Sequence, residues 1–440
     1  MKETHKMADQ STDGRQFYGW INLVVVGVIG VIGGFYIASF SYFMPFLIDD
    51  FGWLYGTISW GATINLMAMG FIGPVAGFFI MKFGARRAIV LGNFLGFAGF
   101  FLLYFHSHLW QLFLGQGLLV GTAAGLGGML ATTTVINNWF VKKRSLGLGI
   151  ALGTGGAGGI FMGPAIVAFI EAYGWRNAYM VISLLVLVFA VIIPGILIRN
   201  KPEDLGQVPD GPVRSKDPAD EQKPLKPLPS YKTPVDFTTG EAMRTRCLWL
   251  LIAYYCLNML AMNALMAHQV NYLIDIGFST IVASFALSVM VGLMTFSKFG
   301  TGFLGMKFNI HSIAIWAEVL KAIGIVILVS TRSYPFVLVY MVVLGLSFGA
   351  MIVSMMNILP NYFGISHYPG IMGFARLFFA IIGSFGAPLA GIVRDKTGSF
   401  VPAFQVVIVI IVAGILCLAL AKPPVHPSLR ASQPEDSAAA

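Results

Sequence analysis

The stretch NNWFVKKRSLG at residues 137–147 has a counterpart, PNYFGISHYPG, at residues 360–370. In each copy an aromatic pair follows an asparagine, and a glycine comes last. Three further pairs of stretches repeat at nearly the same offset: FLIDDFG (46–52) with YLIDIG (272–277), GFFIMKFGARR (77–87) with GFLGMKFNIHS (302–312), and GTAAG (121–125) with GLSFG (345–349). Four matches at nearly one offset predict a chain built from two related halves.

The composition is that of a membrane protein. Of the 440 residues, 57% are hydrophobic and 11% are charged, and the mean hydropathy is +0.79, whereas soluble domains carry about 25% charged residues. Apolar runs of membrane-spanning length recur along the chain, and the first is long enough to be a retained helix rather than a cleaved signal. The expected spans are 20–45, 56–81, 88–105, 109–136, 146–170, 177–198, 247–273, 280–305, 312–330, 334–359, 369–393 and 401–421.

Six spans fall in each half, and an even number gives both halves the same orientation. The predicted fold is therefore an all-α membrane protein with 12 transmembrane helices in two parallel six-helix repeats. The linker between the halves is rich in Pro, Lys, Asp and Glu, and such a segment cannot bury enough apolar surface to fold alone. The expected divisions are an N-terminal segment (1–19), a first bundle (20–199), the linker (200–245), a second bundle (246–421) and a C-terminal tail (422–440).

The formal net charge of +9 is distributed unevenly over the loops. Basic residues gather at 82–87, at 142–144 and in the segment 199–246, which all lie on one side if the spans alternate. Such an excess marks the cytoplasmic side of a membrane protein. We therefore expect a multi-pass protein of the cell membrane with both termini in the cytoplasm, and the charge calls for no nucleic-acid partner.

The sequence contains no recognisable catalytic or metal-binding pattern. Cys247, Cys256 and Cys417 fall in or beside apolar runs without metal-ligand spacing. A GxGxxG pattern at 153–158 lies in a membrane span with no preceding strand, where close helix packing explains the glycines. We expect neither an enzyme nor a cofactor or metal site.

Parallel six-helix repeats are the arrangement of major facilitator transporters, and one loop resembles the signature loop of that superfamily. The loop reads GFFIMKFGARR, and it departs from the family pattern at Met81, where the family usually has Asp. The resemblance implies alternating access, with a substrate site near the membrane midplane between the halves. The residues of the expected gating loop are Gly77, Lys82, Gly84, Arg86 and Arg87.

Within the superfamily the chain is similar to the oxalate:formate antiporter and monocarboxylate transporter group. The similarity rests on FYGWINLVVV (17–26), LSVMVGLMTFSKFGTG (287–302) and GIMGFARLFFAIIGSFGAPLAG (370–391). In that group an Arg of the eighth span meets the substrate carboxylate, and Lys298 occupies that position. Monocarboxylate transporters carry an Asp one turn earlier for proton coupling, where this chain has Thr295. Oxalate exchangers carry a Lys in the eleventh span, where this chain has Arg376.

The two cations are also conspicuous on physical grounds. Thr280 to Met306 holds no charged side chain besides Lys298, and a charge at the bilayer centre costs about 2.5 kcal/mol or more on insertion scales. Lys298 lies 18 residues after Thr280, as Arg376 lies 18 residues before Arg394. If Thr280 and Arg394 mark the outer face, both cations lie at one depth, about 27 Å along their helices at ~1.5 Å per residue.

No acid is expected to neutralise these cations. The interiors of the spans that should line the cavity contain no Asp or Glu. Glu318 lies in the ninth span, expected to be peripheral, and Lys321 three residues on predicts a local pair on the helix surface. Lys298 and Arg376 are therefore predicted to face one another in a gated cavity and to hold an anion. The alternatives are that they snorkel to the membrane surface or are solvated by cavity water.

Five further residues are candidates for the substrate site. Tyr36, Phe40 and Phe348 either line the cavity and exclude water from it, or pack within the bundles. Asn263, like Asn258, orients a ligand or bonds a neighbouring helix. His268 has two interpretations. It carries a proton, since His titrates near neutrality, or it is a hydrogen-bonded residue near the outer end of its span. The five are Tyr36, Phe40, Asn263, His268 and Phe348.

The sequence thus predicts a secondary transporter of small mono- or dicarboxylates. Two uncompensated charges oppose closure of an empty cavity, which favours exchange. The alternative is a proton-coupled symporter of lactate- or pyruvate-like monocarboxylates, because a buried lysine can lose its proton. The expected partners are a small carboxylate anion, protons in the symport alternative, and the lipid bilayer, with one chain as the functional unit. A receptor is disfavoured by the short polar linker, and an exporter of hydrophobic drugs would not need two cations.

Overall fold

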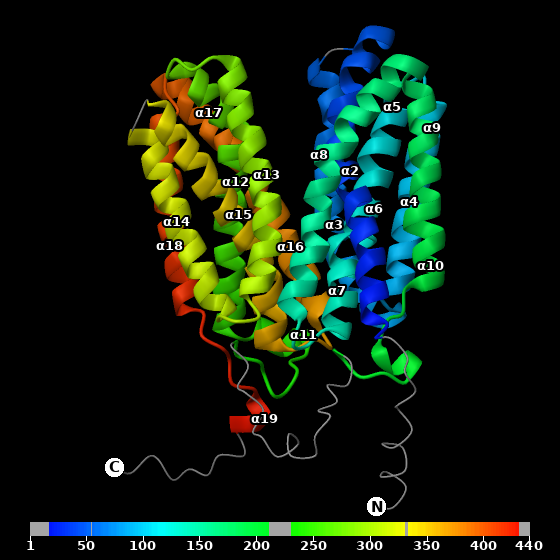
Figure 1. Ribbon diagram of the computed structural model, residues 1–440, viewed down its shortest axis with the longest axis vertical. Helices are drawn as coiled ribbons and strands as arrows, with labels where there is room; N and C mark the ends of the chain where they lie inside the picture. Colours follow the sequence, from blue (N-terminus) through cyan, green and yellow to red (C-terminus); the bar gives the residue numbers. More distant parts are fainter. Residues whose placement is uncertain (1–16, 54, 211–229, 331–332, 431–440) are drawn as a thin grey trace, which may run out of the picture.

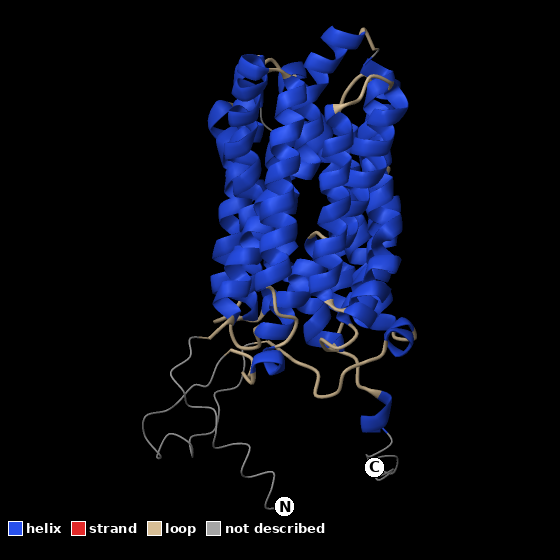
Figure 2. Cartoon of the chain, turned by 90° about the vertical axis from the view of Figure 1, so that its right-hand side faces the viewer, coloured by secondary structure: helices blue, strands red, loops and turns tan. Residues whose placement is uncertain are grey.

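The computed structural model of the protein describes residues 17–53, 55–210, 230–330 and 333–430. Every regular element in these ranges is helical (Figure 2). The N-terminal segment up to residue 16, the middle of the predicted linker and the last ten residues of the tail lie outside the described residues.

The first bundle consists of six membrane-spanning segments. The fourth and the sixth, predicted as continuous helices, are each divided by a short π-helical stretch, labelled η1 and η2. The elements are α2 (Gly19–Phe51), α3 (Tyr55–Phe83), α4 (Ala85–Tyr104), α5 (Leu109–Leu112), η1 (Phe113–Leu119), α6 (Val120–Leu126), α7 (Met129–Trp139), α8 (Arg144–Tyr173), α9 (Trp175–Val186), η2 (Leu187–Ile192) and α10 (Ile193–Leu197).

The second bundle also consists of six spanning segments, and short helices flank it. The eleventh segment, predicted as one helix, is broken between α16 and α17. The elements are η3 (Pro202–Leu205), α11 (Thr239–Met243), α12 (Arg246–Asp275), α13 (Thr280–Leu304), α14 (Ile310–Ser330), α15 (Tyr334–Phe363), α16 (Tyr368–Ser384), α17 (Gly386–Thr397), α18 (Val401–Leu420) and α19 (Pro427–Arg430).

Within the described residues, ten segments are long and apolar enough to cross a membrane. The other two, α2 and α8, are helices of 33 and 30 residues. The predicted all-α fold of twelve helices in two repeats is therefore confirmed. Some predicted spans end too early, since α2 runs to Phe51 and α15 to Phe363. The reason is that hydropathy falls before the last helical turns end.

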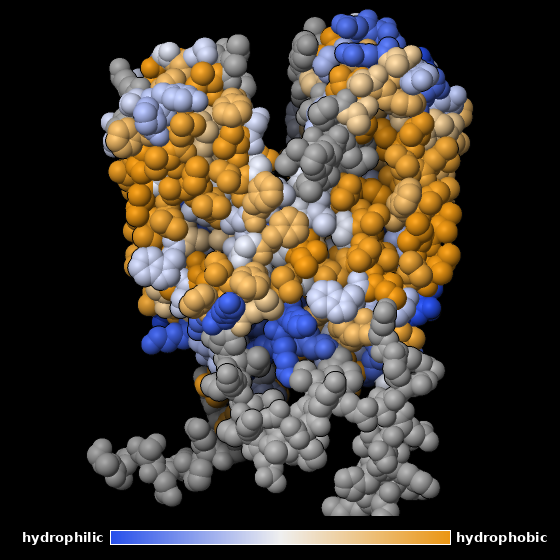
Figure 3. Space-filling view, viewed as in Figure 1, coloured by the Kyte–Doolittle hydropathy of each residue, from blue (hydrophilic) through white to orange (hydrophobic). Residues whose placement is uncertain are grey.

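The two bundles stand side by side (Figure 1). The short helices α11 and α19 lie at one end of the molecule, which we call the linker end, and we call the opposite end the open end. The bundles touch toward the linker end and stand apart at the open end, where Figure 3 shows the surface hollowed between them.

The first contact between the bundles is a seam of glycines between α3 and α16. A Cβ atom on Gly373 would lie 2.5 Å from the carbonyl oxygen of Gly73, and a Cβ on Gly73 would lie 3.0 Å from the carbonyl oxygen of Gly373. Gly77 comes equally close to the backbone of α16. Met81 packs its thioether against Gly370, since a Cβ there would lie 2.9 Å from the sulfur. The helices therefore close on backbone contact and dispersion, with no acidic residue at position 81.

A matching seam joins α8 and α13. A Cβ on Gly149 would lie 2.6 Å from the carbonyl oxygen of Lys298 and 2.8 Å from the Cα of Gly302. A Cβ on Gly302 would lie 2.7 Å from the carbonyl oxygen of Ser145. These residues come from the halves of α8 and α13 nearest the linker end, so both seams hold the bundles together there and leave the open end apart.

Hydrogen bonds cross between the bundles at the same end. Arg144, at the start of α8, donates from Nη1 to Oδ1 of Asn361 on α15 at 3.0 Å. Its neighbour Ser145 donates from Oγ to Oδ1 of Asn357, also at 3.0 Å. The hydroxyl groups of Thr133 on α7 and Tyr368 on α16 lie 3.2 Å apart. The linker end is thus both close-packed and hydrogen-bonded.

The described ends of the linker dock on equivalent loops of the two halves. Asp210 accepts hydrogen bonds from the backbone N–H groups of residues 141–143, in the loop before α8. Asp236 accepts from the N–H and the hydroxyl of Ser366, in the loop before α16. Between them, Lys232 donates from Nζ to the carbonyl oxygen of Val141 at 2.5 Å. Burial, with the nearby Arg144, lowers the pKa of this ammonium group to about 8. The described parts of the linker therefore connect the two bundles at this end of the molecule.

The seams predict that Gly373→Ala destabilises the protein. The new methyl group would press on the Gly73 carbonyl, and a clash that backbone must absorb typically costs about 1–3 kcal/mol. We expect a lower thermal midpoint of the purified protein in detergent. Gly300→Ala, on α13 where a Cβ meets nothing within 4 Å, is the matched control and should be neutral or stabilising. Equal midpoints for the two variants would contradict the seam.

Candidate functional site

Lys298 lies on the side of α13 that faces the first bundle. Thr295, one turn earlier, meets Gly156 of α8, and Gly302, one turn later, meets Gly149. Lys298 itself is 7% exposed. The seam therefore holds this lysine between the bundles rather than against lipid.

Arg376 has the corresponding place on α16. Its Cβ lies 3.5 Å from the position that a Cβ on Gly73 of α3 would take. Gly373 and Ala380, before and after it on the same face, also touch α3. Its Nη1 atom is buried and has no hydrogen-bond partner. The guanidinium group thus enters the space between the bundles with hydrogen-bonding capacity unused.

The two cations lie at similar distances from the linker end. Lys298 precedes the end of α13 at Leu304 by six residues, and Arg376 follows the start of α16 at Tyr368 by eight. At ~1.5 Å per residue these positions are roughly 9 and 12 Å from the helix ends. In the part of the chain that the structure describes, neither cation forms an ion pair with an acid.

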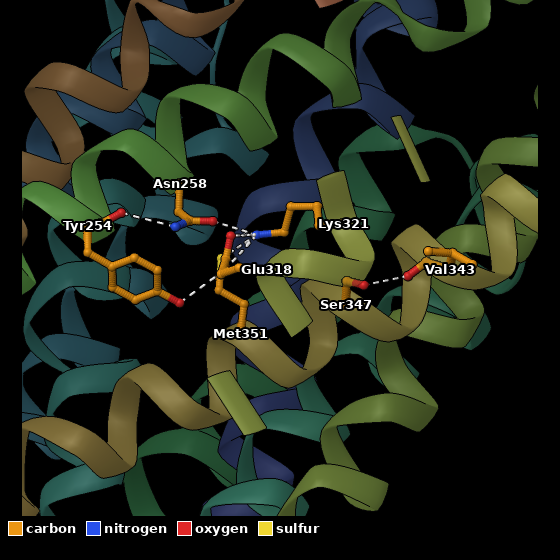
Figure 4. A network of polar contacts seen from close by, with 7 residues as sticks. All are labelled: Tyr254, Asn258, Glu318, Lys321, Val343, Ser347 and Met351. Carbon is orange, nitrogen blue, oxygen red and sulfur yellow. Dashed lines mark hydrogen bonds and ion pairs between the residues drawn. The ribbon is translucent and has the colours of Figure 1, made fainter. Parts of the chain in front are cut away.

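The acid in the middle of a span has another partner. Glu318 and Lys321 of α14 form an ion pair at 2.8 Å, and both side chains are fully buried. Figure 4 shows this pair between Asn258 of α12, which accepts a hydrogen bond from Lys321, and α15. Tyr254 donates to Glu318 at 3.0 Å. The predicted pair exists, but its predicted place on the helix surface was wrong, because α14 packs against α15 and α18 and turns the pair inward, where it bonds to α12.

The three predicted aromatic residues lie in the cores of their own bundles. Tyr36 is 1% exposed and donates to Oδ1 of Asn93 at 2.8 Å. Phe40 is 5% exposed and packs beside Gly61 of α3. Phe348 is fully buried, with the Lys321 ammonium 5.0 Å from its ring centre. Of the two interpretations made from the sequence, packing describes these surroundings, so we do not include the three rings in the site proposed below.

Asn263 and His268 both bind the broken eleventh span. Asn263 donates from Nδ2 to the carbonyl oxygen of Gly383 at 2.9 Å. His268 donates from Nε2 to the carbonyl oxygen of Ala387 at 2.9 Å, and its Nδ1 is buried without a partner. A break in a membrane helix frees carbonyl groups that other side chains must satisfy. Both residues therefore bond a neighbouring helix, and a role toward ligand or proton stays a prediction.

The predicted gating-loop residues all belong to the first bundle, but they lie in different surroundings. Gly77 lies in the seam with α16. Arg86 binds within its own bundle, where its guanidinium group donates to the carbonyl oxygen of Gly195. Gly84 has a positive φ of 87° before α4, a backbone conformation that favours glycine. Lys82 and Arg87 are exposed.

Two buried polar residues near the seams were not predicted from the sequence. Asn137 of α7 is 1% exposed, and neither atom of its amide has a hydrogen-bond partner of normal geometry, although it lies beside the Tyr368 hydroxyl. Ser354 of α15 is fully buried with a free hydroxyl. Asn137 stands in the repeated stretch NNWFVKKRSLG, so an amide inside a repeated motif was the available signal.

The described residues contain no group of three or more His, Cys, Asp or Glu side chains that could hold a metal ion. The polar groups that the seams bring together are cations, hydroxyls and amides. Such a set suits an anion, because ammonium and guanidinium groups only donate hydrogen bonds.

The family model described as Major Facilitator Superfamily matches residues 25–328 and, in a second match, residues 275–439. The chain belongs to the major facilitator superfamily. It is a multi-pass membrane transporter rather than an enzyme. The superfamily predicted from the sequence is thereby confirmed.

The similar proteins include several members of the monocarboxylate transporter group, which the sequence motifs resemble. Monocarboxylate transporter 13 of Bos taurus is 26% identical over 409 residues, which cover 90% of this chain and 88% of that protein. Monocarboxylate transporter 12 of Rattus norvegicus is 26% identical over 336 residues, with coverages of 72% and 67%. Monocarboxylate transporter 11 of Homo sapiens is 23% identical over 409 residues, with coverages of 88% and 79%.

Solved structures of the superfamily share the fold. The E. coli fucose:proton symporter superposes with a TM-score of 0.69 at 15% identity, covering 93% of this chain and all of that one (100%). The proton:xylose symporter XylE superposes with a TM-score of 0.70 at 12% identity, covering 91% of this chain and 94% of that one. At these identities the likeness shows the architecture of the transporter and nothing about its substrate.

The buried ion pair of this major facilitator protein predicts a double-mutant result. Lys321→Met leaves the Glu318 carboxylate buried without its partner, which typically costs about 3–5 kcal/mol. Lys321→Met combined with Glu318→Gln removes both charges and should recover most of that loss. The measurement is the thermal midpoint in detergent, with the exposed Lys396→Met as control. If Lys321→Met alone is as stable as the control, the ion pair does not stabilise the fold.

Proposed function

We propose that the protein transports small organic anions with carboxylate groups across the cell membrane, and that Lys298 and Arg376 hold the anion between the bundles. In this proposal the linker end lies in the cytoplasm, because the basic loops are there, and both termini are on the same side. One chain is the functional unit, since it supplies both bundles and both cations.

The observation that carries the proposal is a pair of cations, the buried Lys298 and the half-buried Arg376, that have no acidic partner among the described residues. Both project from seam faces at similar depth, and Nη1 of Arg376 is buried with no acceptor. A buried donor without a partner costs about 1–3 kcal/mol, and more for a charged group. A carboxylate supplies acceptor atoms and a negative charge at once, so a bound acid would remove both penalties.

The same electrostatics favours exchange of one anion for another. Alternating access requires the open end to close while the seams at the linker end separate. Closing over two unpaired cations removes the remaining water, which is strongly unfavourable unless an anion goes with them. The loaded protein then crosses more readily than the empty one, which couples exit of one anion to entry of another.

Proton-coupled uptake of a monocarboxylate is the second candidate. The names of the similar proteins favour monocarboxylates as the substrate class. Lys298 stands where that group has Arg, and an ammonium group can release its proton whereas a guanidinium group holds it. With Lys298 neutral, the empty site carries one charge fewer and its closure is easier.

Neutral variants of the two cations test the site. Lys298→Gln and Arg376→Gln each remove one charged hydrogen bond to the anion, worth about 1.5–3 kcal/mol. This corresponds to a loss of affinity for the anion of roughly 10- to 150-fold. The measurement is uptake of radiolabelled oxalate, formate, lactate, pyruvate and acetate into liposomes that contain the purified protein. Lys396→Gln, an exposed cation at the open end, is the charge-matched control. Uptake by both variants at the control rate would refute the proposed site.

The coupling mode is tested in the same liposomes. Exchange predicts that uptake of the labelled acid requires an unlabelled acid inside the liposomes and does not change when a pH gradient is imposed. Symport predicts net uptake into empty liposomes when the outside is acidic. A protonophore is the control for the pH gradient. Net uptake driven by pH alone would replace exchange by symport and leave the binding site unchanged.

A further inference from the structure

A second cationic site lies on the outer surface of the first bundle, away from the space between the bundles. A cavity of about 710 Å³ opens between the start of α4 and the end of α10. Its polar lining includes Arg86, Arg87 and Asn200, and none of its lining residues is acidic. The site lies at the linker end, where the membrane-spanning helices begin.

Arg86 is held in place before any ligand arrives. Its Nε donates to the carbonyl oxygen of Gly195 at 2.9 Å, and one terminal nitrogen donates to the same oxygen. Its backbone N–H donates to Oδ1 of Asn200 at 2.8 Å. The space beside Gly195 is open, since a Cβ there would meet only Val90, at 3.4 Å. A fixed guanidinium group loses little conformational freedom on binding an anion.

The apolar part of the cavity continues from the arginines toward the membrane interior. Arg87, Val90, Leu91 and Phe94 follow one another at helical spacing on one face of α4. Leu91 and Phe94 are 43% and 47% exposed, and Phe83 beside them is 37% exposed. Arg87 is exposed and forms no ion pair with the residues that the structure describes. The surface thus places two positive charges at the membrane edge above an apolar strip.

We propose that this cavity binds the anionic headgroup of a phospholipid, with an acyl chain lying along Val90, Leu91 and Phe94. Charge complementarity selects the headgroup, because two arginines with no acidic neighbour in the cavity attract phosphate oxygens. The apolar strip selects a lipid over a free phosphate ion, which has nothing to place there. The bound lipid joins α4 to α10 and stabilises the linker end of the first bundle. This inference does not depend on which solute is transported.

The test compares lipids added to the purified full chain in detergent. Dioleoylphosphatidylglycerol should raise the thermal midpoint, and dioleoylphosphatidylcholine, which has no net charge, should raise it less. Arg87→Gln should increase the concentration of phosphatidylglycerol for half-maximal stabilisation about fivefold or more. Lys396→Gln, an exposed cation at the open end, should not. Arg86 is left unchanged because it also holds α10.

Two further arms separate the lipid from a soluble anion. Phe94→Ser shortens the apolar strip at an exposed position and should weaken the effect of phosphatidylglycerol. Glycerol phosphate, the headgroup chemistry without acyl chains, should stabilise the protein little at the same concentrations. Equal effects of the two lipids, equal responses of Arg87→Gln and Lys396→Gln, or full stabilisation by glycerol phosphate would each overturn the proposal.

Discussion

Backbone contact between glycines at two seams, α3 with α16 and α8 with α13, is the constraint from which the rest of the structure follows. Between membrane helices there is no hydrophobic driving force, so association depends on how closely the surfaces approach. A glycine on each side allows carbonyl oxygens to touch the opposite helix. Among the described side chains, the seam contacts lie in the linker halves of these helices. Beyond them the bundles diverge, and the surface is hollowed at the open end (Figure 3).

The charged side chains inside the protein are of two kinds, paired and unpaired. Lys321 is enclosed by an acid, an amide and an aromatic ring on three helices of the second bundle (Figure 4). It needs nothing further, and it binds these helices into one body. Lys298 and Arg376 have no such enclosure among the described residues, although burying a charge without a partner is costly. The proposed anion site rests on this difference between the two arrangements.

The repeat explains why the cations face glycines. At the offset of 225 that relates GFFIMKFGARR to GFLGMKFNIHS, Lys298 corresponds to Gly73. At the offset of 223 that relates NNWFVKKRSLG to PNYFGISHYPG, Arg376 corresponds to Gly153. Each of these glycines lies against the helix that carries the other cation. The two halves thus share one packing scheme, in which the second half carries charged residues at positions that the first half uses for close contact.

The sequence by itself determined the class of fold, because hydropathy, repeat offset and loop charge are local or additive properties. It also singled out Lys298 and Arg376, since a charge in an apolar run is visible without coordinates. Only the tertiary structure decided which polar residues have partners. Asn263 and His268 bond the break of the eleventh span, Tyr36 and Phe348 enter the bundle cores, and Glu318 and Lys321 turn inward. Those outcomes depend on which face of a helix meets which neighbour, and a sequence of almost uniformly apolar helices does not encode that on any one helix alone.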